Sequence, residues 1–214
     1  MVDPMHTYYS DRAPHMAKNL GTVPEGQFLE IITELKNCAK NRNVLEVACG
    51  TGFWTQQIAP VSRHIVATDF SDDMLEVARG QGLNKVRFLH DDAYQLAHVG
   101  SELFEFGYAM HWVSHIPLAR WDEFFTTFHS RLKPGAKVIL CDDIHRSDDT
   151  DPYYCKLDSR DSFEIRHLPG GKSYEIVKTY FTPESLRDLL QPHADDIEIH
   201  FDRPRWWVSY EVKR

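Results

Sequence analysis

The strongest chemical signal in the sequence is a glycine-containing loop between a short apolar run and a helix-like segment. The segment NVLEVACGTG contains Gly50 and Gly52, which can adopt positive φ and let a ligand approach bare backbone. Unpaired N–H groups at the start of the next helix favour polar or anionic ligand groups. Asp69 ends the next apolar run, where a carboxylate can accept both hydrogen bonds of a ribose diol. This combination predicts a nucleotide-type ligand.

Acidic residues near the ends of other apolar runs refine that prediction. Asp91 and Asp92, followed by Ala93, come after the third run, and such strand ends border the ligand crevice of an open α/β sheet. Glu46 lies two residues inside the first run, where an acid is unfavourable for a pyrophosphate but suits an ammonium group. Thr55 stands where dinucleotide-binding loops have their third glycine, which disfavours a nicotinamide cofactor.

Two histidines follow the fourth apolar run and could take part in chemistry. A histidine can remove a proton at neutral pH, so His111 is a candidate general base. His115 is a candidate contact for the substrate. Their spacing of four residues also resembles half of a helical zinc site. However, Pro117 follows closely and no glutamate accompanies the pair, so no metal ion is predicted.

The elements that must position these residues alternate along the chain. Short runs rich in Val, Ile and Leu predict strands at residues 43–48, 64–68, 85–89, 104–109 and 136–141. Helices are predicted at residues 25–39, 53–59, 71–79 and 117–132. Ser71 is the expected N-cap of the third helix. Alternating buried strands and helices predict an α/β fold with a parallel sheet and right-handed crossovers.

The sequence becomes polar and irregular after the fifth run, and residues from about 142 to 180 form a candidate lid over the site. The lid carries Tyr153, Tyr154 and Arg166, which could enclose a small aromatic or anionic molecule. A solvent-exposed charged segment is the alternative. The tyrosine pair is expected at the entry of a helix. After the lid, a helix starts at Thr182 and two further strands supply an antiparallel edge.

Composition excludes several classes of partner. The chain of 214 residues has 24 basic and 32 acidic residues, a net charge of −8, and no basic run suited to nucleic acid. Its longest apolar stretches are far shorter than the roughly 20 residues that cross a bilayer, so no membrane span is expected. The four cysteines share no Cys-x-x-Cys spacing, which predicts reduced thiols and a cytoplasmic location.

Five motifs in order resemble those of the class I S-adenosylmethionine-dependent methyltransferases. They are EVACGTG, ATDFSDDML, LHDDA, FEFGYAMHW and RLKPGAKVIL. The resemblance spans residues 44–140, and the closing segments FTPESL and WWVSYEV are also similar. It implies a three-layer sandwich with a mostly parallel seven-stranded sheet, the last strand antiparallel, as in the Rossmann-like methyltransferase fold. It further implies S-adenosylmethionine as cofactor and S-adenosylhomocysteine as product.

The resemblance also implies roles for residues of the first two motifs. Glu46, Ala48, Gly50 and Gly52 would surround the methionine part of the cofactor. Asp69 would bind the ribose hydroxyls. Many members of the family have glycine where this chain has Ala48, but alanine is also small.

Further roles follow from the later motifs. Phe70 and Met74 would sandwich the adenine, unless they are ordinary core residues. Asp92 would accept a hydrogen bond from the adenine amine, and the backbone N–H of Ala93 would reach a ring nitrogen. The backbone carbonyl of Met110 would lie near the methionine amine.

The N-terminal segment TYYSDRA resembles a cap helix, predicted at about residues 6–20, that closes over the cofactor carboxylate. Tyr8, Tyr9 and Arg12 would make these contacts, although two tyrosines on a surface helix are also common. Residues 1–214 are expected to form a single domain. The acidic pair at the end of the fifth strand, Asp142 and Asp143, is similar to that of metal-dependent catechol-type methyltransferases. The matching aspartate after the fourth strand is missing.

The leading functional prediction is methyl transfer by in-line displacement to an O, N or C nucleophile of a small molecule. Three alternatives stay open: a protein methyltransferase, an aminopropyltransferase-like enzyme, and a module that binds the cofactor without turnover. Aminopropyl transfer favours an aspartate after the fourth strand, where this chain has Met110 and His111. Arginine methylation favours two glutamates there, and none is present. A binding-only module would show cofactor affinity but no turnover.

Overall fold

The computed structural model describes residues 4–19, 28–145, 153–157 and 159–213. Seven strands form a central sheet in the order β3-β2-β1-β4-β5-β10-β9. The strands are β1 Asn43–Val47, β2 His64–Asp69, β3 Val86–His90, β4 Phe104–Met110, β5 Leu132–Asp143, β9 Ala194–Asp202 and β10 Arg205–Val212. Strands β1 to β5 are mutually parallel, and β10 runs antiparallel to β5 and to β9. The mostly parallel sheet with an antiparallel last strand is confirmed.

Helices alternate with the first strands as predicted. The helices are α1 Pro4–Asn19, α2 Leu29–Ala39, α3 Phe53–Ile58, α4 Asp72–Gly80, α5 Trp121–Ser130 and α6 Pro183–Leu190, with 3₁₀ turns η1 Val113–His115 and η2 Leu118–Arg120. The Ser71 hydroxyl accepts a hydrogen bond from the N–H of Met74 and caps α4. None of the helices in the described part of the chain is long and apolar enough to cross a membrane.

One predicted helix, at residues 117–132, is too long at both ends. Its first turn is the separate 3₁₀ turn η2, and its last predicted residue, Leu132, already begins β5. The aromatic stripe within it is nevertheless buried, with Phe124, Phe125 and Phe128 fully inaccessible. The apolar periodicity therefore identified the buried face but not the ends, because a 3₁₀ turn and an extended segment continue the same pattern.

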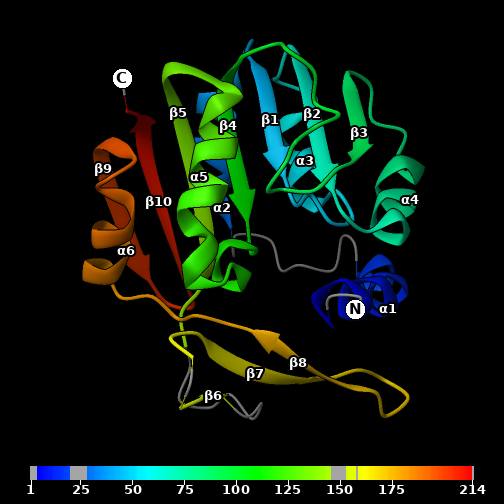
Figure 1. The fold of residues 1–214 in the computed structure, drawn as a ribbon. Coiled ribbons are helices and arrows are strands. Elements are labelled where there is room, and N and C mark those ends of the chain that lie inside the picture. Colours follow the sequence, from blue (N-terminus) through cyan, green and yellow to red (C-terminus); the bar gives the residue numbers. More distant parts are fainter. Residues whose placement is uncertain (1–3, 20–27, 146–152, 158, 214) are drawn as a thin grey trace.

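Two apolar clusters cover the two faces of the sheet and create three layers (Figure 1). Ile31 and Leu35 of α2 pack with Ile58 of α3 in one cluster. Phe124 of α5 and Leu186 of α6 belong to the other. Strands β1 and β4 contribute to both clusters and are therefore covered on both sides, as expected of central parallel strands.

The carboxyl ends of the parallel strands face α1 and a second, smaller sheet (Figure 1). This lid sheet consists of the antiparallel strands β6 Tyr153–Cys155, β7 Ser162–His167 and β8 Ser173–Val177. The expected helix entry at the tyrosine pair is wrong, since Tyr153 and Tyr154 lie in β6; Asp151 and Pro152 lie outside the described residues. A polar segment becomes a sheet here because consecutive strands pair side by side as an antiparallel meander, with Cys155 opposite Ser162 and His167 opposite Ser173.

Candidate functional site

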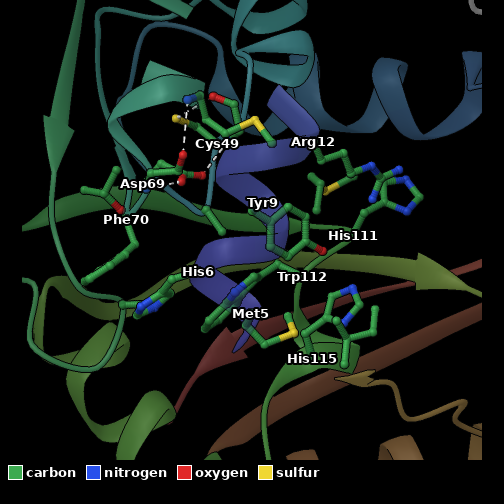
Figure 2. Close-up of a pocket in the computed structure, with 18 of the residues that line it drawn as sticks. Met5, His6, Tyr9, Arg12, Cys49, Asp69, Phe70, His111, Trp112 and His115 are labelled. Atoms are coloured by element: carbon green, nitrogen blue, oxygen red, sulfur yellow. Dashed lines mark hydrogen bonds between the residues drawn. The ribbon is translucent and has the colours of Figure 1, made fainter. Parts of the chain in front are cut away.

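A cavity of about 500 Å³ opens at the carboxyl ends of the parallel strands. Figure 2 shows α1 crossing it, with Asp69 and Phe70 to one side and His111 and His115 to the other. Ten of the thirteen residues expected to bind the cofactor line it: Tyr9, Arg12, Ala48, Gly50, Asp69, Phe70, Met74, Asp92, Ala93 and Met110. Tyr8, Glu46 and Gly52 do not line it. His111, His115 and Arg166 do.

The loop between β1 and α3 is held by Asp69. Its Oδ2 accepts a hydrogen bond from the Gly50 N–H at 2.8 Å, and its Oδ1 accepts one from the Ser71 N–H at 2.9 Å. Ala48 and Gly50 have φ values of 56° and 55°. A Cβ added at Gly50 would meet no atom within 4 Å, so this glycine faces open space in the cavity wall. Burial raises the pKa of Asp69, and the backbone hydrogen bonds from Ser71 and Gly50 oppose that rise.

Gly52 plays a different part from the predicted one. Its φ is 82°, and an added Cβ would lie 2.8 Å from Nε2 of Gln81 and 3.3 Å from the Cβ of Ala78. The glycine therefore allows the start of α3 to pack against α4, behind the cavity wall. A packing glycine and a ligand-contacting glycine give the same sequence signal, because both need the absence of a Cβ.

Glu46 is also placed behind the wall, with only 1% of its surface exposed. Its Oε2 accepts a hydrogen bond from Thr55 Oγ1 at 2.6 Å. Burial raises the pKa of Glu46 to about 8, and the hydrogen bond from Thr55 acts in the opposite direction. The carboxyl group thus supports the loop from below, and Thr55, which stands where a third glycine would be, is its partner.

The acidic pair after β3 separates into two roles. Asp91 is 4% exposed, and its carboxylate accepts hydrogen bonds from the N–H groups of Asp92, Ala97 and His98. It therefore organises the turn that follows β3, at the edge of the cavity that it also lines. Asp92 lines the cavity and accepts a hydrogen bond from the Tyr94 N–H at 2.8 Å.

Aromatic side chains from α1 and the strand ends form the walls on both sides. Phe70 remains 41% exposed, and the ring of His6 stacks on it with 3.5 Å between centroids. Tyr9 lies 5.8 Å from His115, ring centre to ring centre, and burial raises its pKa. Tyr8 is 2% exposed and packs beside Tyr9, so it belongs to the core of the cap. His6, which stands about one turn before Tyr9 on α1, was not predicted from the sequence.

His111 has a φ of 55°, which turns its side chain away from the path of β4. Its Nδ1 lies 3.5 Å from Oδ1 of Asp143, and its ring stacks on Trp54. Burial alone would raise the pKa of Asp143, but the hydrogen bond and charge of His111 hold it below its ordinary value. The ionised carboxylate beside His111 can stabilise an imidazolium, as a general base requires.

His115 is held as a neutral imidazole. Its Nδ1 lies 2.7 Å from the carbonyl oxygen of Val177, so Nδ1 must carry the proton and Nε2 the lone pair. Burial, followed by the charge of Lys178, lowers the pKa of His115 to about 3. At neutral pH this histidine can accept a hydrogen bond from a ligand but is a poor proton acceptor.

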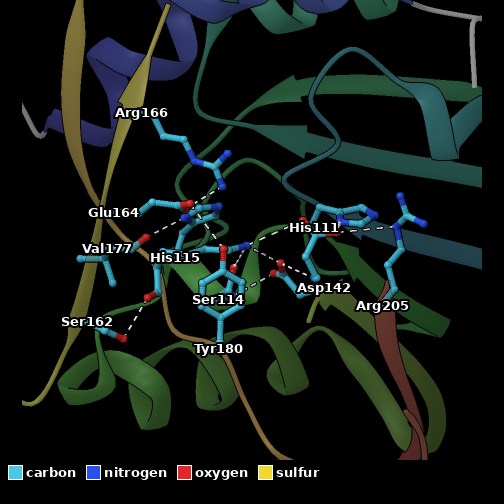
Figure 3. A network of polar contacts seen from close by, with 12 residues as sticks. His111, Ser114, His115, Asp142, Ser162, Glu164, Arg166, Val177, Tyr180 and Arg205 are labelled. Carbon is cyan, nitrogen blue, oxygen red and sulfur yellow. Dashed lines mark hydrogen bonds and ion pairs between the residues drawn. The ribbon is translucent and has the colours of Figure 1, made fainter. Parts of the chain in front are cut away.

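A buried ion pair ties the lid to the central sheet (Figure 3). Nζ of Lys178, just after β8, lies 2.8 Å from Oδ1 of Asp142 and donates to Oγ of Ser114 at 2.9 Å. Asp142 also accepts a hydrogen bond from the N–H of Ser114. Burial opposes the charged form of Asp142, but Lys178 holds its pKa well below the usual range. Lys178 was not predicted as a site residue, although it alternates with Ile176 and Tyr180 in the sequence as an inward-facing strand residue would.

The lid residues expected to contact the acceptor do not stay together. Arg166 of β7 lines the cavity, and its Nη2 lies 2.7 Å from Oε2 of the buried Glu164. Tyr153 is 38% exposed and packs against His145 and Tyr180, away from the cavity lining. Tyr154 donates a hydrogen bond to Glu175 within the lid sheet. Since alternate residues of a strand face opposite sides, strand placement separates residues that one lid segment groups together.

Among the described residues, His111, Asp142 and Asp143 form one cluster whose ligand atoms lie within 4.8 Å of one another. The ammonium of Lys178 already neutralises Asp142, and it lies 3.9 Å from Oδ2 of Asp143. A divalent cation would be repelled by this adjacent positive charge. The cluster therefore fits an ammonium better than a metal ion.

Comparison with known proteins agrees with this geometry. Residues 44–135 match a family described as "Methyltransferase domain". The chain is 32% identical over 103 residues to "Demethylmenaquinone methyltransferase" of Clavibacter sepedonicus, covering 46% of this chain and 40% of that protein. It is 29% identical over 153 residues to "Ubiquinone biosynthesis O-methyltransferase" of Ruegeria pomeroyi, covering 69% and 57%. The chain thus spans about half the length of these curated relatives.

Solved structures share the fold over nearly the whole chain. A structure described as "DhpI-SAH complex structure" has a TM-score of 0.78 and 22% identity, covering 98% of this chain and 96% of that one. The "CcbJ Methyltransferase from Streptomyces caelestis" has a TM-score of 0.69 and 17% identity, covering 96% and 98%. These similarities extend to α1 and the lid sheet, which the family match does not include.

Proposed function

We propose that this chain, which belongs to the class I S-adenosylmethionine-dependent methyltransferases, transfers a methyl group to a small-molecule acceptor inside the cavity. The main support is the loop in which the Gly50 N–H is held by Asp69 at the open ends of β1 and β2. The cofactor would present its reactive end toward His111 and His115. The names of the two relatives that act on quinones or in quinone biosynthesis support a small-molecule acceptor.

The residues present suit S-adenosylmethionine. Gly50 leaves open space at the wall, and the carboxylate of Asp69 is positioned to accept hydrogen bonds from ribose hydroxyls. The exposed ring of Phe70 and the side chain of Met74 border a space suited to a flat base. The carboxylate of Asp92 and the backbone of Ala93 would bind the edge of that base. Arg12 and the Met110 carbonyl would bind the carboxylate and amine of the methionine part.

When bound, the cofactor supplies a methyl group already activated by a sulfonium, so the protein mainly orients the reactants and excludes water. Tyr9 and α1 would close the cavity on one side, and the lid sheet on the other. The Nε2 lone pair of His115 would orient a donor on the acceptor. His111, paired with Asp143, would take up a proton where the acceptor has one to lose.

The wall of the cavity also bears on the alternative functions. At the lid end, Arg166, Lys178 and Arg205 line it together with the carboxylate of Asp143, and this excess of cations disfavours the polyamine acceptor of an aminopropyltransferase. The coverage by α1 and the lid sheet favours a small molecule over a protein side chain. A module without turnover would bind the cofactor equally well, so turnover itself is the deciding measurement.

Calorimetric titration with S-adenosylhomocysteine tests the proposal. Asp69→Asn should weaken binding by at least about tenfold, since a charge-assisted hydrogen bond contributes about 1.5–3 kcal/mol. Asp188→Asn, at an exposed position on α6, is the control and should leave affinity unchanged. A screen of small acceptors, with S-adenosylhomocysteine release as readout, tests transfer. Absence of measurable binding by the unmodified protein would refute the proposal.

A further inference from the structure

The charged residues at the lid end of the cavity are arranged with their positive groups facing inward. Arg166 and Lys178 line the cavity, whereas their partners Glu164 and Asp142 do not. The side chains of these two acids are 3% and 0% exposed. Asp143 also lines the cavity, 3.9 Å from Nζ of Lys178, but its other oxygen faces His111 and Arg205. Beside Arg166 and Lys178, a ligand therefore meets the cations first, with Glu164 and Asp142 behind them.

Among the described residues, Lys178 has two hydrogen-bond acceptors for its ammonium, and the ring centre of Tyr180 lies 5.2 Å from its Nζ. An ammonium carries three N–H groups, and Lys178 directs two of them to Asp142 and Ser114. The next acceptor, Oδ2 of Asp143, is 3.9 Å away, beyond hydrogen-bond distance. The lysine lines the cavity, although its side chain is only 2% exposed. A ligand oxygen in the cavity could accept a further hydrogen bond from this ammonium.

Arg166 brings a planar guanidinium to the same place. Its Nη2 lies 2.7 Å from Oε2 of Glu164, and its positive charge lines the cavity, where it can attract an oxyanion. Both cations lie close enough to His115 to lower its pKa by their charges. Figure 3 shows Arg166 and Glu164 beside His115, with Ser114 and Asp142 next to it. The two cations thus flank one neutral imidazole.

We propose that the methyl acceptor carries an oxyanion, either a carboxylate or a phosphoryl group, which binds at the lid end of the cavity between Arg166 and Lys178. This inference rests on the proposed methyltransferase function and specifies its substrate class. The oxyanion would accept a hydrogen bond from Lys178 and pair with the guanidinium of Arg166. His115, which is neutral and has its lone pair on Nε2, would accept a hydrogen bond from a donor elsewhere on the acceptor.

Equilibrium binding to the protein saturated with S-adenosylhomocysteine tests the inference without turnover. The probes are 4-hydroxybenzoate against its neutral match 4-hydroxybenzamide, and phenyl phosphate against phenol. The charged member of at least one pair should bind about tenfold more tightly or better, the scale of one charge-assisted hydrogen bond. Its affinity should also fall with added salt. The pair that shows the larger difference distinguishes a carboxylate from a phosphoryl group.

Substitutions locate the effect. Arg166→Gln should reduce the affinity for the anionic probe about tenfold, and Arg166→Lys should restore part of it. Arg160→Gln removes an exposed lid cation that does not line the cavity and should change nothing. S-adenosylhomocysteine affinity should stay within about twofold in all three variants, which also shows that they are folded.

Two outcomes would overturn the inference. One is equal affinity for the charged and neutral members of both pairs. The other is an equal loss in Arg160→Gln and Arg166→Gln, which would indicate a diffuse surface effect. Absence of S-adenosylhomocysteine binding is a different result, because it refutes the proposed methyltransferase function before any acceptor is added.

Discussion

Replacing Lys178 by methionine removes the positive charge that compensates the buried carboxylate of Asp142. The two side chains are 2% and 0% exposed, and their charged atoms lie 2.8 Å apart. Methionine retains most of the volume, so the main change is electrostatic. Breaking a buried pair by removing one partner costs about 3–5 kcal/mol, because the other charge stays behind unpaired. For a chain of this size that loss corresponds to about 6–20 °C in melting temperature.

The pH dependence of stability should change sign. In the unmodified protein the pKa of Asp142 is lower in the folded than in the unfolded state. The stabilisation is therefore present above the unfolded pKa and is lost as pH falls through the folded pKa. In Lys178→Met, burial dominates and raises the folded pKa above the unfolded one. Lowering the pH should then stabilise the variant by up to about 1.4 kcal/mol per pH unit between the two pKa values.

Urea denaturation of both proteins between pH 5 and 8 measures this difference. Lys178→Met combined with Asp142→Asn is the matched control, because it removes both charges and should recover part of the lost stability. The pH dependence introduced by the single substitution should be absent from this control. A loss in Lys178→Met below about 1 kcal/mol, or one that is the same at every pH, would show that the pair does not carry the assigned energy.

Three further predictions concern the cavity and its supports. Gly52→Ala should destabilise the fold by about 1–3 kcal/mol. The loss of stability should exceed that caused by Gly50→Ala, because both glycines have positive φ but only an added Cβ at Gly52 would meet close neighbours. Equal melting temperatures of the two variants would contradict this. Turnover should be unchanged by EDTA, since the Lys178 ammonium neutralises the cluster that could bind a metal; loss restored by magnesium would disprove that argument. Arg166→Ala should lower turnover while Tyr153→Ala leaves it within about twofold, and equal losses would place both side chains at the acceptor.

Signals of short range in the sequence determined the central architecture. The apolar runs predicted strands β1 to β5, and the Ser71 cap and its helix were found as expected. The order of loop, helix and acid after β1 and β2 also predicted that Gly50 and Asp69 would lie together. These features are readable because a strand end, a cap and a tight loop each depend on a few adjacent residues. Parallel topology then brings the strand ends to one edge of the sheet.

The roles of individual polar residues were harder to predict from the sequence, even within motifs whose secondary structure was predicted correctly. Glu46 and Gly52 do not line the cavity and support its wall from behind, whereas Asp91 lines it but uses its carboxylate to bind backbone N–H groups of the turn after β3. Residue type gives no distinction between a group that binds a ligand and one that holds the loop, since both need the same donors, acceptors or missing Cβ. The distinction depends on which way each side chain points after the loop has packed against α4.

Only the tertiary structure decided the composition of the acceptor end. Lys178 and Asp142 are 36 residues apart, and Arg166 reaches the same cavity from another strand. Their meeting depends on how β7 and β8 pair and on where the lid sheet lies over β5. A shift of one residue in that pairing would turn each side chain to the opposite face. The sequence by itself therefore determined a cofactor-binding α/β sheet, whereas long-range pairing decided which charges face the acceptor, because strand register sets side-chain direction.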